Sequence, residues 1–547
     1  MGALLAAAAC TLCSEDYRGP PPFAGDRPMI LRVRSTRDSM AMHMKRILGL
    51  GLMFVLAASG APKQPKLVVA VIFDQFRYDY LTRFRAEYHA GFDRLLTQGA
   101  VFTNARYDHY PTVTAVGHST YLTGATPAIS GIVGNSWYDR TVGKTVTSVS
   151  DSGTKLVGSE GQGSSPRRLL VDTIGDELRK SSAGKSRVIG ISHKDRAAIL
   201  PAGHSANAAY WFLDPSDRFV TSDYYMNDLP SWVRDFNGSH PCQAYAGQKW
   251  LDHTLPTEVG NLCQAVTDSP FGNDLLERFA ERALEAEQLG KHDAIDLLTV
   301  SFSSNDAVGH QYGPDSPEAH ELCITSDRIL GRLLSAIERQ VGADGYVLVV
   351  SADHGVAPTP EANAALKMPG GRLTGNPVAK AVEAALAKRY GDAKWVVNNG
   401  ETGLYLNLDT IESKKLDRAE VDRVAAEAAL TVPQVFRAYT REQLLIGQIQ
   451  NDSIGKRVLN GFFAQRSPDV EVLLDPYWIT GSSGASHSTP FGYDTHVPVI
   501  FFGATIRPGH YDGPIMPNDV APTLATLLSI ETPAGSIGRA LAEIFAQ

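Results

Sequence analysis

The sequence has few cysteines and no excess of basic residues. Only five of its 547 residues are cysteine, so disulfides can contribute little to its framework. Lysine and arginine total 51 against 59 for aspartate and glutamate, which gives a formal net charge of −8. A general nucleic-acid or anionic-membrane binder needs a basic surface, so we expect neither kind of partner. Any phosphate site in this chain must therefore be locally positive.

An apolar run near the start is too short to cross a membrane. The segment Met44–Gln64 opens with Lys45 and Arg46, continues with apolar residues 47–58 and ends in small residues. This order is typical of a secretory signal, and a run of about twelve residues is shorter than the roughly 20 that a membrane span requires. We expect cleavage near residues 59–61. The mature protein would then be periplasmic or secreted, without a membrane anchor.

Residues 1–43 hold a second apolar patch and an arginine-rich stretch before Met44. We interpret residues 1–61 as an over-extended N-terminus plus the signal peptide, with Met44 as the true start. The alternative for the apolar run is a buried helix. A signal fits the two leading cations and the polar stretch after the run better.

Three cysteines remain after the expected cleavage, Cys242, Cys263 and Cys323. An oxidising compartment permits one disulfide. We favour Cys242 with Cys263, which would close a loop containing glycine and proline, but the sequence leaves this pairing open. Cys323 lies in a helical pattern and is expected in the core.

The remaining composition is that of an ordinary globular protein. Apolar residues make up 43% and charged residues 20%, enough for one large α/β domain with insertions or for two domains. Continuous apolar, β-branched runs predict strands covered on both faces. Helical patterns separate them, so we expect an α/β fold with a doubly wound, mostly parallel sheet sandwiched by helices. The expected strands are 66–73, 297–302, 346–351 and 497–502, and the expected helices include 92–97, 168–178, 275–287 and 520–528.

Two stretches interrupt this alternation. Residues 202–262 are rich in aromatics, glycine, proline and asparagine, and residues 360–479 carry helical and strand patterns of their own. We expect a catalytic domain over 66–545, in which both stretches are insertions that form a lid or cap over the site.

Three of the expected strands end at aspartates. Asp74 follows the first strand, Asp306 follows the second and Asp353 follows the third. Open α/β sheets bind ligands at the carboxyl ends of their strands, so these carboxylates should meet at one edge. One such aspartate could equally cap the next helix, but three are harder to explain in that way.

Histidines accompany these aspartates in a pattern typical of metal ligands. Mixed imidazole and carboxylate ligands in this number suit two Zn²⁺ ions, whereas Ca²⁺ and Mg²⁺ sites would contain fewer histidines. Each histidine alone could be an ordinary hydrogen-bonded side chain, and the prediction rests on the whole set. The candidate ligands are Asp74, Asp306, His310, Asp353, His354 and His487.

Thr114 is the candidate nucleophile. It lies in the segment PTVTAVGH, residues 111–118, where a helix is expected to begin. The positive end of a helix dipole and a nearby zinc ion would both favour the alkoxide. An isolated threonine here could also be an N-cap with no chemistry, and His118 could be a structural side chain on the same helix.

Several segments resemble the alkaline phosphatase superfamily, and specifically its phosphate-irrepressible alkaline phosphatases of the PafA type. The similarity runs in the order of that family from Lys66 onward. It is carried by HYPTVTAVGHSTYLTG with GIVGNSWYD downstream, SHKDRAAILPAGH, NDAVGHQYGP, VLVVSADHG and GASHSTPFGYDTHVPVIFFG.

The resemblance implies a nucleophile, two zinc sites and a phosphate-binding trio. Thr114 would be the nucleophile, and Asn135, Lys194 and Arg196 would hold the nonbridging phosphate oxygens. One zinc would be held by Asp74, Thr114, Asp353 and His354, and the other by Asp306, His310 and His487. His496 is an alternative to His487, because it lies in the same segment.

The expected activity is zinc-dependent hydrolysis of small-molecule phosphate monoesters through a covalent phosphothreonine. A monoester dianion matches the two cations Lys194 and Arg196, whereas a diester has one charge fewer and a second organic group. The alternatives are a phosphodiesterase or nucleotide pyrophosphatase of the same superfamily and, more remotely, a non-catalytic phosphate- or metal-binding protein. A sulfatase is disfavoured because Thr114-Ala115-Val116 lacks the C/S-x-P-x-R signature. The physiological substrate, the oligomeric state and a third metal are not readable from the sequence.

Overall fold

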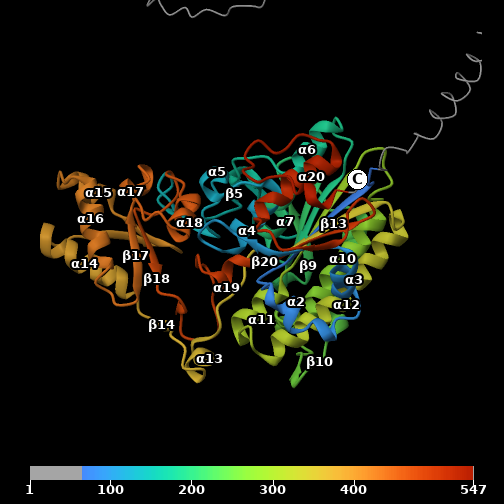
Figure 1. Cartoon of the computed structure of the whole chain (residues 1–547), viewed down its shortest axis with the longest axis horizontal. Helices are drawn as coiled ribbons and strands as arrows, with labels where there is room; N and C mark the ends of the chain where they lie inside the picture. The colour runs from blue at the N-terminus through green and yellow to red at the C-terminus, as the bar shows by residue number, and fades with distance from the viewer. Residues whose placement is uncertain (1–63, 546–547) are drawn as a thin grey trace, which may run out of the picture. The chain divides into compact units, whose positions relative to one another are not determined.

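The computed structural model describes residues 64–545 (Figure 1). The chain divides into two units, Met1–Ala61 and Pro62–Gln547, and all described residues belong to the second. The expected signal peptide and start site lie outside the described residues. Within residues 64–545, every helix is either too short or too polar to span a bilayer.

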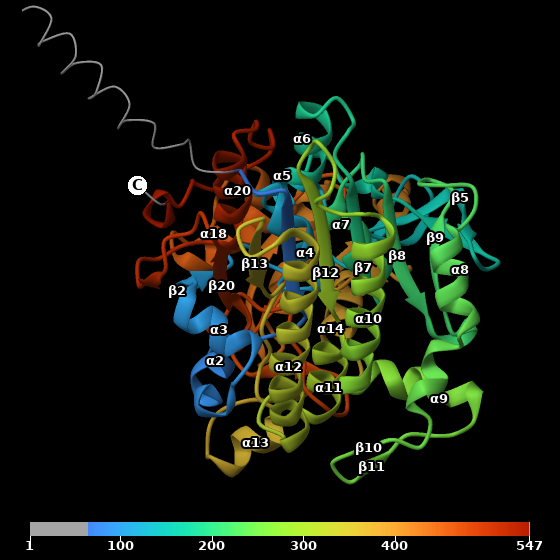
Figure 2. The ribbon, with the colours of Figure 1, turned by 90° about the vertical axis from the view of Figure 1, so that its right-hand side faces the viewer.

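A large sheet forms the centre of this unit, as the sequence predicts (Figure 2). Its eleven strands follow the order β21-β2-β20-β13-β1-β12-β7-β8-β9-β5-β6. The five strands from β13 to β8 are parallel to one another, while β20 and β9 run antiparallel to their inner neighbours. The bounds are β1 (Leu67–Phe73), β2 (Ala100–Arg106), β5 (Ser150–Val157), β6 (Gln162–Ser164), β7 (Val188–Ser192), β8 (Ala208–Leu213), β9 (Arg218–Ser222), β12 (Asp296–Phe302), β13 (Tyr346–Ser351), β20 (His496–Gly503) and β21 (Gly509–Tyr511).

Alternate residues of β1 enter two separate hydrophobic cores, which explains its continuous apolar sequence. Leu67, Val69 and Val71 pack into one core, and Val68 and Ala70 pack into the other. The first core also holds residues of α3 (Gly91–Gln98), α10 (Pro270–Ala286) and α12 (Pro317–Val341), and the second holds residues of α4 (Thr114–Thr123), α6 (Ile174–Ser181) and α20 (Val520–Leu528). The predicted sandwich of helices around the sheet is therefore confirmed.

The stretch 202–262, expected to be a cap, in fact supplies part of the large sheet. Its strands β8 and β9 extend the sheet beyond β7. The rest of it forms α8 (Ser231–Gly238), β10 (Lys249–Trp250), β11 (His253–Thr254) and α9 (Val259–Thr267). The sequence AAYWFL of β8 is a regular buried strand, and the glycine, proline and asparagine that suggested an insertion occupy the connections around it.

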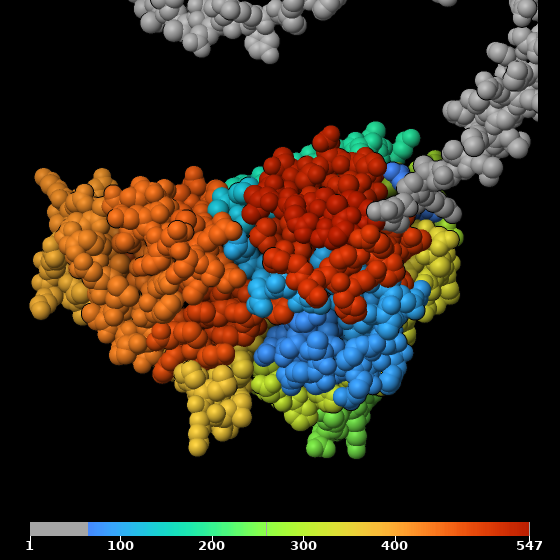
Figure 3. All heavy atoms as spheres, viewed as in Figure 1, coloured from blue at the N-terminus to red at the C-terminus, as the bar shows by residue number. Residues whose placement is uncertain are grey.

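The second interruption builds a sheet of its own. Four strands in the order β15-β16-β18-β17 pack with helices around a separate hydrophobic core. They form one contiguous body in the space-filling view (Figure 3). The chain enters and leaves through β14 and β19, which pair with each other. The bounds are α13 (Pro360–Ala365), β14 (Gly371–Leu373), α14 (Pro377–Tyr390), β15 (Val396–Asn399), β16 (Gly403–Leu406), α15 (Leu408–Ser413), α16 (Arg418–Ala429), β17 (Val435–Thr440), α17 (Arg441–Leu445), α18 (Ser453–Gly461), β18 (Val470–Leu474) and β19 (Trp478–Thr480).

Smaller elements connect these layers. They are α2 (Asp79–Arg83), α5 (Pro127–Ser130), β3 (Ser136–Asp139), β4 (Lys144–Thr147), α7 (Asp195–Ala202), α11 (Ser304–Tyr312) and α19 (Gly492–Thr495). The paired strands β3 and β4 form a hairpin. The helix expected over 168–178 begins only at Ile174, because Thr173 and Asp176 form a capping box at that point.

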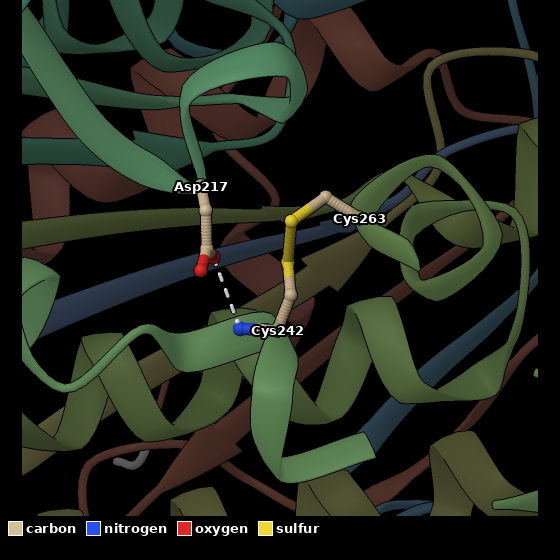
Figure 4. A group of neighbouring side chains, drawn as sticks. All are labelled: Asp217, Cys242 and Cys263. Carbon is tan, nitrogen blue, oxygen red and sulfur yellow. Dashed lines mark hydrogen bonds between the residues drawn. A yellow bond between two sulfur atoms is a disulfide. The ribbon is translucent and has the colours of Figure 1, made fainter. Parts of the chain in front are cut away.

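Cys242 and Cys263 form a disulfide, the pairing that we favoured (Figure 4). Their Cα atoms lie 5.4 Å apart. Asp217 accepts a hydrogen bond of 3.0 Å from the Cys242 amide and so fixes the loop beside the bridge. Cys323 is buried in the first core, as expected.

Candidate metal and phosphate site

Three neighbouring parallel strands deliver the three predicted aspartates to one edge of the sheet. Asp74 directly follows β1, Asp353 follows β13 by two residues, and Asp306 lies in the first turn of α11 after β12. Because β1 lies between β13 and β12, the carboxylates come together at their carboxyl ends. Asp74 and Asp353 have no exposed surface and Asp306 is 7% exposed.

Three histidines join these carboxylates. His354 Nε2 lies 3.5 Å from Asp74 Oδ1, and His310 Nε2 lies 3.2 Å from Asp306 Oδ1. His487 Nε2 lies 3.2 Å from His310 Nε2 and 3.6 Å from Asp306 Oδ1. The rings of His354 and His487 stack at 3.7 Å between centroids. All six predicted ligands therefore form one continuous cluster.

The cluster contains two groups that could hold a metal ion. Asp74, Asp353 and His354 form one group, and Asp306, His354 and His487 form the other, with ligand atoms within 4.8 Å of one another in each. The resemblance assigned His310 instead of His354 to the second group. Here His310 touches both Asp306 and His487, so it also borders the second group.

A cation fits the chemistry of these side chains. Asp74 Oδ1, Asp353 Oδ2 and His354 Nε2 are buried and have no hydrogen-bond partner among residues 64–545. Burial, and then the neighbouring Asp353, raises the pKa of Asp74 well above its usual value. Burial and the two other imidazoles lower the pKa of His487 far enough to keep it neutral, the form that binds metals. Buried carboxylate oxygens without a donor, beside neutral imidazoles, are atoms that a divalent cation would stabilise.

Gln75 orients two of the carboxylates, although nothing in the sequence singles it out. Its backbone N–H donates to Asp353 Oδ1 at 3.0 Å, and its side-chain Nε2 donates to Asp306 Oδ1 at 2.7 Å. The residue has a φ of +62°, a backbone conformation that a non-glycine residue seldom adopts. This sharp turn at the end of β1 allows one residue to reach both neighbours. No sequence pattern predicts that a glutamine after an apolar strand adopts a left-handed backbone conformation.

Thr114 is the first residue of α4, as predicted, and is 2% exposed. This helix packs directly against Asp353, since a methyl group on Gly117 would overlap the Asp353 carbonyl. His118 Nδ1 lies 2.8 Å from the Thr114 carbonyl oxygen and 3.2 Å from Asp353 Oδ2. One side chain thus connects the turn that carries Thr114 to a metal-site carboxylate. His118 therefore has a structural role beside the site.

Lys194 and Arg196 follow strand β7 at the same edge of the sheet. Lys194 is the N-cap of α7, and its Nζ lies 2.6 Å from Asp74 Oδ2 and 2.6 Å from Asp306 Oδ2. Arg196 lies in the first turn of α7, and its Nε has no hydrogen-bond partner among the described residues. Lys194 is neutralised here by the carboxylates of Asp74 and Asp306, so a positive phosphate site at this edge would need bound metal ions in addition to the two cations.

Asn135 lies next to Thr114 and is tied to the second insertion. Its Oδ1 accepts a hydrogen bond of 2.9 Å from the amide of Ala115, which leaves its Nδ2 donors for another partner. Glu401, from the loop between β15 and β16, accepts from the amides of Asn135 and Ser136 at 3.0 and 2.9 Å. Glu401 is a second residue that sequence reasoning missed, because the contact spans more than 260 positions.

The geometry distinguishes His487 from its rival His496. His487 Nδ1 lies 2.8 Å from the Thr112 carbonyl oxygen, so its Nε2 is directed toward Asp306 and His310. His496 instead lies on β20, stacks on Tyr78 and places its Nε2 2.9 Å from the Thr103 carbonyl oxygen. Of the two histidines, only His487 therefore belongs to the cluster.

Comparisons with known proteins agree with this geometry. The family model for type I phosphodiesterase / nucleotide pyrophosphatase matches residues 68–496. Similar proteins are the alkaline phosphatase PafA of Elizabethkingia meningoseptica (34% identical, 90% of this chain and 98% of that protein), the alkaline phosphatase PhoV of Synechococcus elongatus (34%, 88% and 93%) and a protein of Myroides odoratus named calcium-transporting ATPase (35%, 90% and 97%).

Solved structures give the same result. A crystal structure of wild-type alkaline phosphatase PafA is 32% identical, covers 89% of this chain and all of that chain, and superposes with a TM-score of 0.83. Murine ectonucleotide pyrophosphatase / phosphodiesterase 5, bound to AMP, is 16% identical with a TM-score of 0.52 and shares the fold. The resemblance stated from the sequence is confirmed. This chain is a member of the type I phosphodiesterase / nucleotide pyrophosphatase family within the alkaline phosphatase superfamily, and its close relatives include the alkaline phosphatases PafA and PhoV.

Proposed function

We propose that this protein is a zinc-dependent alkaline phosphatase that hydrolyses phosphate monoesters through a covalent phosphothreonine on Thr114. The observation that carries the proposal is that six candidate metal ligands meet the amino end of α4 and the two cations Lys194 and Arg196 at one edge of the sheet. The PafA and PhoV relatives, which are named alkaline phosphatases, support the same activity.

Two Zn²⁺ ions fit the ligand chemistry. Asp74, Asp353 and His354 would hold one together with Thr114, and Asp306, His310 and His487 would hold the other. When bound, the ions would supply Lewis-acid charge that polarises the phosphoryl group and lowers the pKa of a nucleophile.

The chain's own residues then account for positioning and charge. Thr114 Oγ1, after losing its proton to solvent, attacks phosphorus, and the ester P–O bond breaks on the opposite side. The departing alkoxide takes a proton from solvent and leaves as the alcohol. Water next attacks the phosphothreonine, regenerating Thr114 and releasing inorganic phosphate. Two in-line steps give net retention at phosphorus. The amino end of α4 stabilises negative charge on Thr114.

The phosphate-binding trio favours a dianion. Lys194, Arg196 and the free amide of Asn135 would oppose the charge on three nonbridging oxygens, and they would do so in a water-poor site where such contacts are strong. A diester offers one negative charge fewer and replaces one oxygen by an organic group. The trio therefore supports monoesters over diesters.

Trapping tests the covalent step. On incubation with ³²P-labelled monoester and rapid acid quench, we expect label on Thr114 in the wild type and none in Thr114→Ala. We expect turnover by Thr114→Ala to fall by at least about 10³-fold, since removal of a nucleophile leaves only binding and electrostatic catalysis. Thr114→Ser is the matched control and should keep the label. Undiminished turnover in Thr114→Ala would remove the mechanism.

A phosphodiesterase is the second candidate, because the matching family model bears that description. The discriminating measurement is kcat/KM for an aryl monoester against the corresponding diester. We expect the wild type to prefer the monoester and Lys194→Ala to lose about 10²-fold on the monoester but little on the diester, since charge-assisted contacts to a dianion are lost. Equal or diester-biased values for the wild type would reverse the assignment.

The expected surroundings of the site follow from the same proposal. We infer that the enzyme acts after export. We also infer that the insertion over 360–479 acts as a cap, because Glu401 of this insertion reaches Asn135. Zinc-dependent turnover, abolished by a chelator and restored by Zn²⁺, separates an enzyme from a binding protein that uses the same ligands.

A further inference from the structure

A cavity opens between the insertion and the loop that carries His487. Its volume is about 160 Å³. On the side of the site it is bordered by His487 and by Glu401, the partner of Asn135. Its remaining walls combine apolar side chains, among them Val378, Leu404, Val472 and Trp478, with polar residues, among them Asn376, Asn399 and Thr402.

The cavity is anchored to the segment that carries the nucleophile. Tyr110 precedes Thr114 by four residues, and its hydroxyl donates to the Val472 carbonyl on β18 at 3.2 Å. The carbonyl of Thr112 bonds to His487, and the Thr112 hydroxyl donates to Thr489 at 2.8 Å. The cavity therefore holds a fixed position beside the metal-type cluster.

We propose that this cavity receives the alcohol portion of the monoester, and that it fits a neutral, apolar group containing one six-membered ring. This rests on the proposed function, which requires the alcohol to leave next to the cluster. The size supports a single ring, since an apolar cavity of about 150 Å³ in another protein holds one benzene molecule. The carboxylate of Glu401 in the wall disfavours alcohols that carry negative charge.

The test uses alkyl phosphates that release alcohols of similar acidity. Methyl, benzyl and 2-naphthylmethyl phosphate are compared by kcat/KM on the zinc-loaded enzyme. We expect benzyl phosphate to exceed methyl phosphate by about 10²-fold, because apolar surface of the ring is removed from water in the transition state. The two-ring ester should be no better than the benzyl ester. A higher value for the two-ring ester overturns the size assignment.

Two variants locate the effect. Trp478→Ala removes the large aromatic wall, and Ala379→Phe fills the cavity from α14. Both should lower the benzyl-to-methyl ratio by about tenfold. Trp478→Ala removes apolar contact with the ring and Ala379→Phe takes up its space, and either loss is comparable to leaving a few methylene groups unburied. Leu445→Ala changes an exposed apolar residue of the same insertion outside the cavity and should keep the ratio and both rates. A ratio unchanged in both cavity variants overturns the proposal.

The outcomes also separate this inference from the function on which it rests. Failure to hydrolyse any of the three esters would sink the proposed phosphatase activity. Hydrolysis of all three with equal kcat/KM would leave that activity standing and remove only the assignment of the cavity.

Discussion

Among the buried polar atoms without partners in residues 64–545, two cases have opposite consequences. Those of Asp74, Asp353 and His354 face one another, so one cation could satisfy all three. Glu471 on β18 is different, because it is 5% exposed, its Oε2 has no partner among residues 64–545, and no imidazole or second carboxylate groups with it as a metal site there. Burial raises the pKa of Glu471 to about 8.

This raised pKa predicts a dependence of stability on pH. The unfolded carboxyl group ionises near 4.5 whereas the folded one keeps its proton to about 8, so the free energy of unfolding falls as pH rises between these values. Glu471→Gln removes that dependence. At pH 9 we expect the variant to melt higher than the wild type, with a gain of a few kcal/mol at about 1.4 kcal/mol per pKa unit. Near pH 5 the two should be close.

The control for this comparison is Glu412→Gln, an exposed glutamate of the same insertion. Its melting temperature should differ from that of the wild type by the same small amount at both pH values. A difference for Glu471→Gln that does not grow from pH 5 to pH 9 would show that this carboxyl group is ionised in the folded protein.

Individual site residues could be predicted from the sequence where their residue type and position both indicate a metal ligand. Asp74 and Asp353 were predictable because each follows an apolar strand, and His354 because it adjoins one of them. Gln75 and Glu401 were not predictable, since their value lies in where the fold places them. One depends on an unusual φ and the other on a contact between segments far apart in sequence.

Helix α4 and the strands β1, β12 and β13 together position the reactive groups. The close packing of α4 on Asp353 depends on Gly117, whose lack of a side chain lets the two backbones approach. The distance between Thr114 and the metal-type ligands is therefore set by one small residue in the middle of a helix.

Gly117→Ala should separate these groups. The added methyl group overlaps the Asp353 carbonyl, so α4 must shift outward. We expect kcat/KM to fall by about 10²-fold, as a misplacement of about 1 Å commonly causes, and the free energy of unfolding to fall by about 1–3 kcal/mol. Gly238→Ala, at the end of α8 where a methyl group meets nothing within 4 Å, is the matched control. Activity within twofold of the wild type would contradict this role.

Helices and strands with one clear hydrophobic pattern could be predicted from the sequence, whereas those interrupted by turns could not. The apolar runs of β1, β12 and β13 have no competing interpretation at their length, and α20 was expected over the same residues. By contrast, β8 and β9 are short strands between polar connections, so local composition concealed their place in the large sheet. Only tertiary pairing identifies them, since β8 pairs with β7 and β9 pairs with β8.

Residues 64–545 join a large sheet and an inserted smaller one around a shared site. Contacts from both converge on the segment 110–135, which is contacted by Asp353 beside the large sheet and by Val472 and Glu401 of the insertion. The metal-type cluster lies at the centre of these contacts, so metal binding should influence the stability of the whole protein.

Removal of metal tests whether metal binding stabilises the folded protein. We expect a chelator to abolish monoester turnover and to lower Tm, and added Zn²⁺ to restore both, because ligand binding to the folded state adds about 4 kcal/mol at 1,000 times the Kd. His487→Ala should lose much of the zinc-dependent rise in Tm. His496→Ala should keep it, since that imidazole bonds to Thr103 instead. An equal loss in both variants would contradict the choice of His487.

The position of β20 affects the order in which the newly made chain can assemble. This strand, near the end of the sequence, lies between β13 and β2 and is hydrogen-bonded to both. A growing polypeptide that stops short of residue 503 has a gap in its sheet and, before residue 487, an incomplete ligand set. High sequence separation between pairing strands slows folding. The polypeptide can therefore complete its set of candidate metal ligands only after residue 487 has been synthesised.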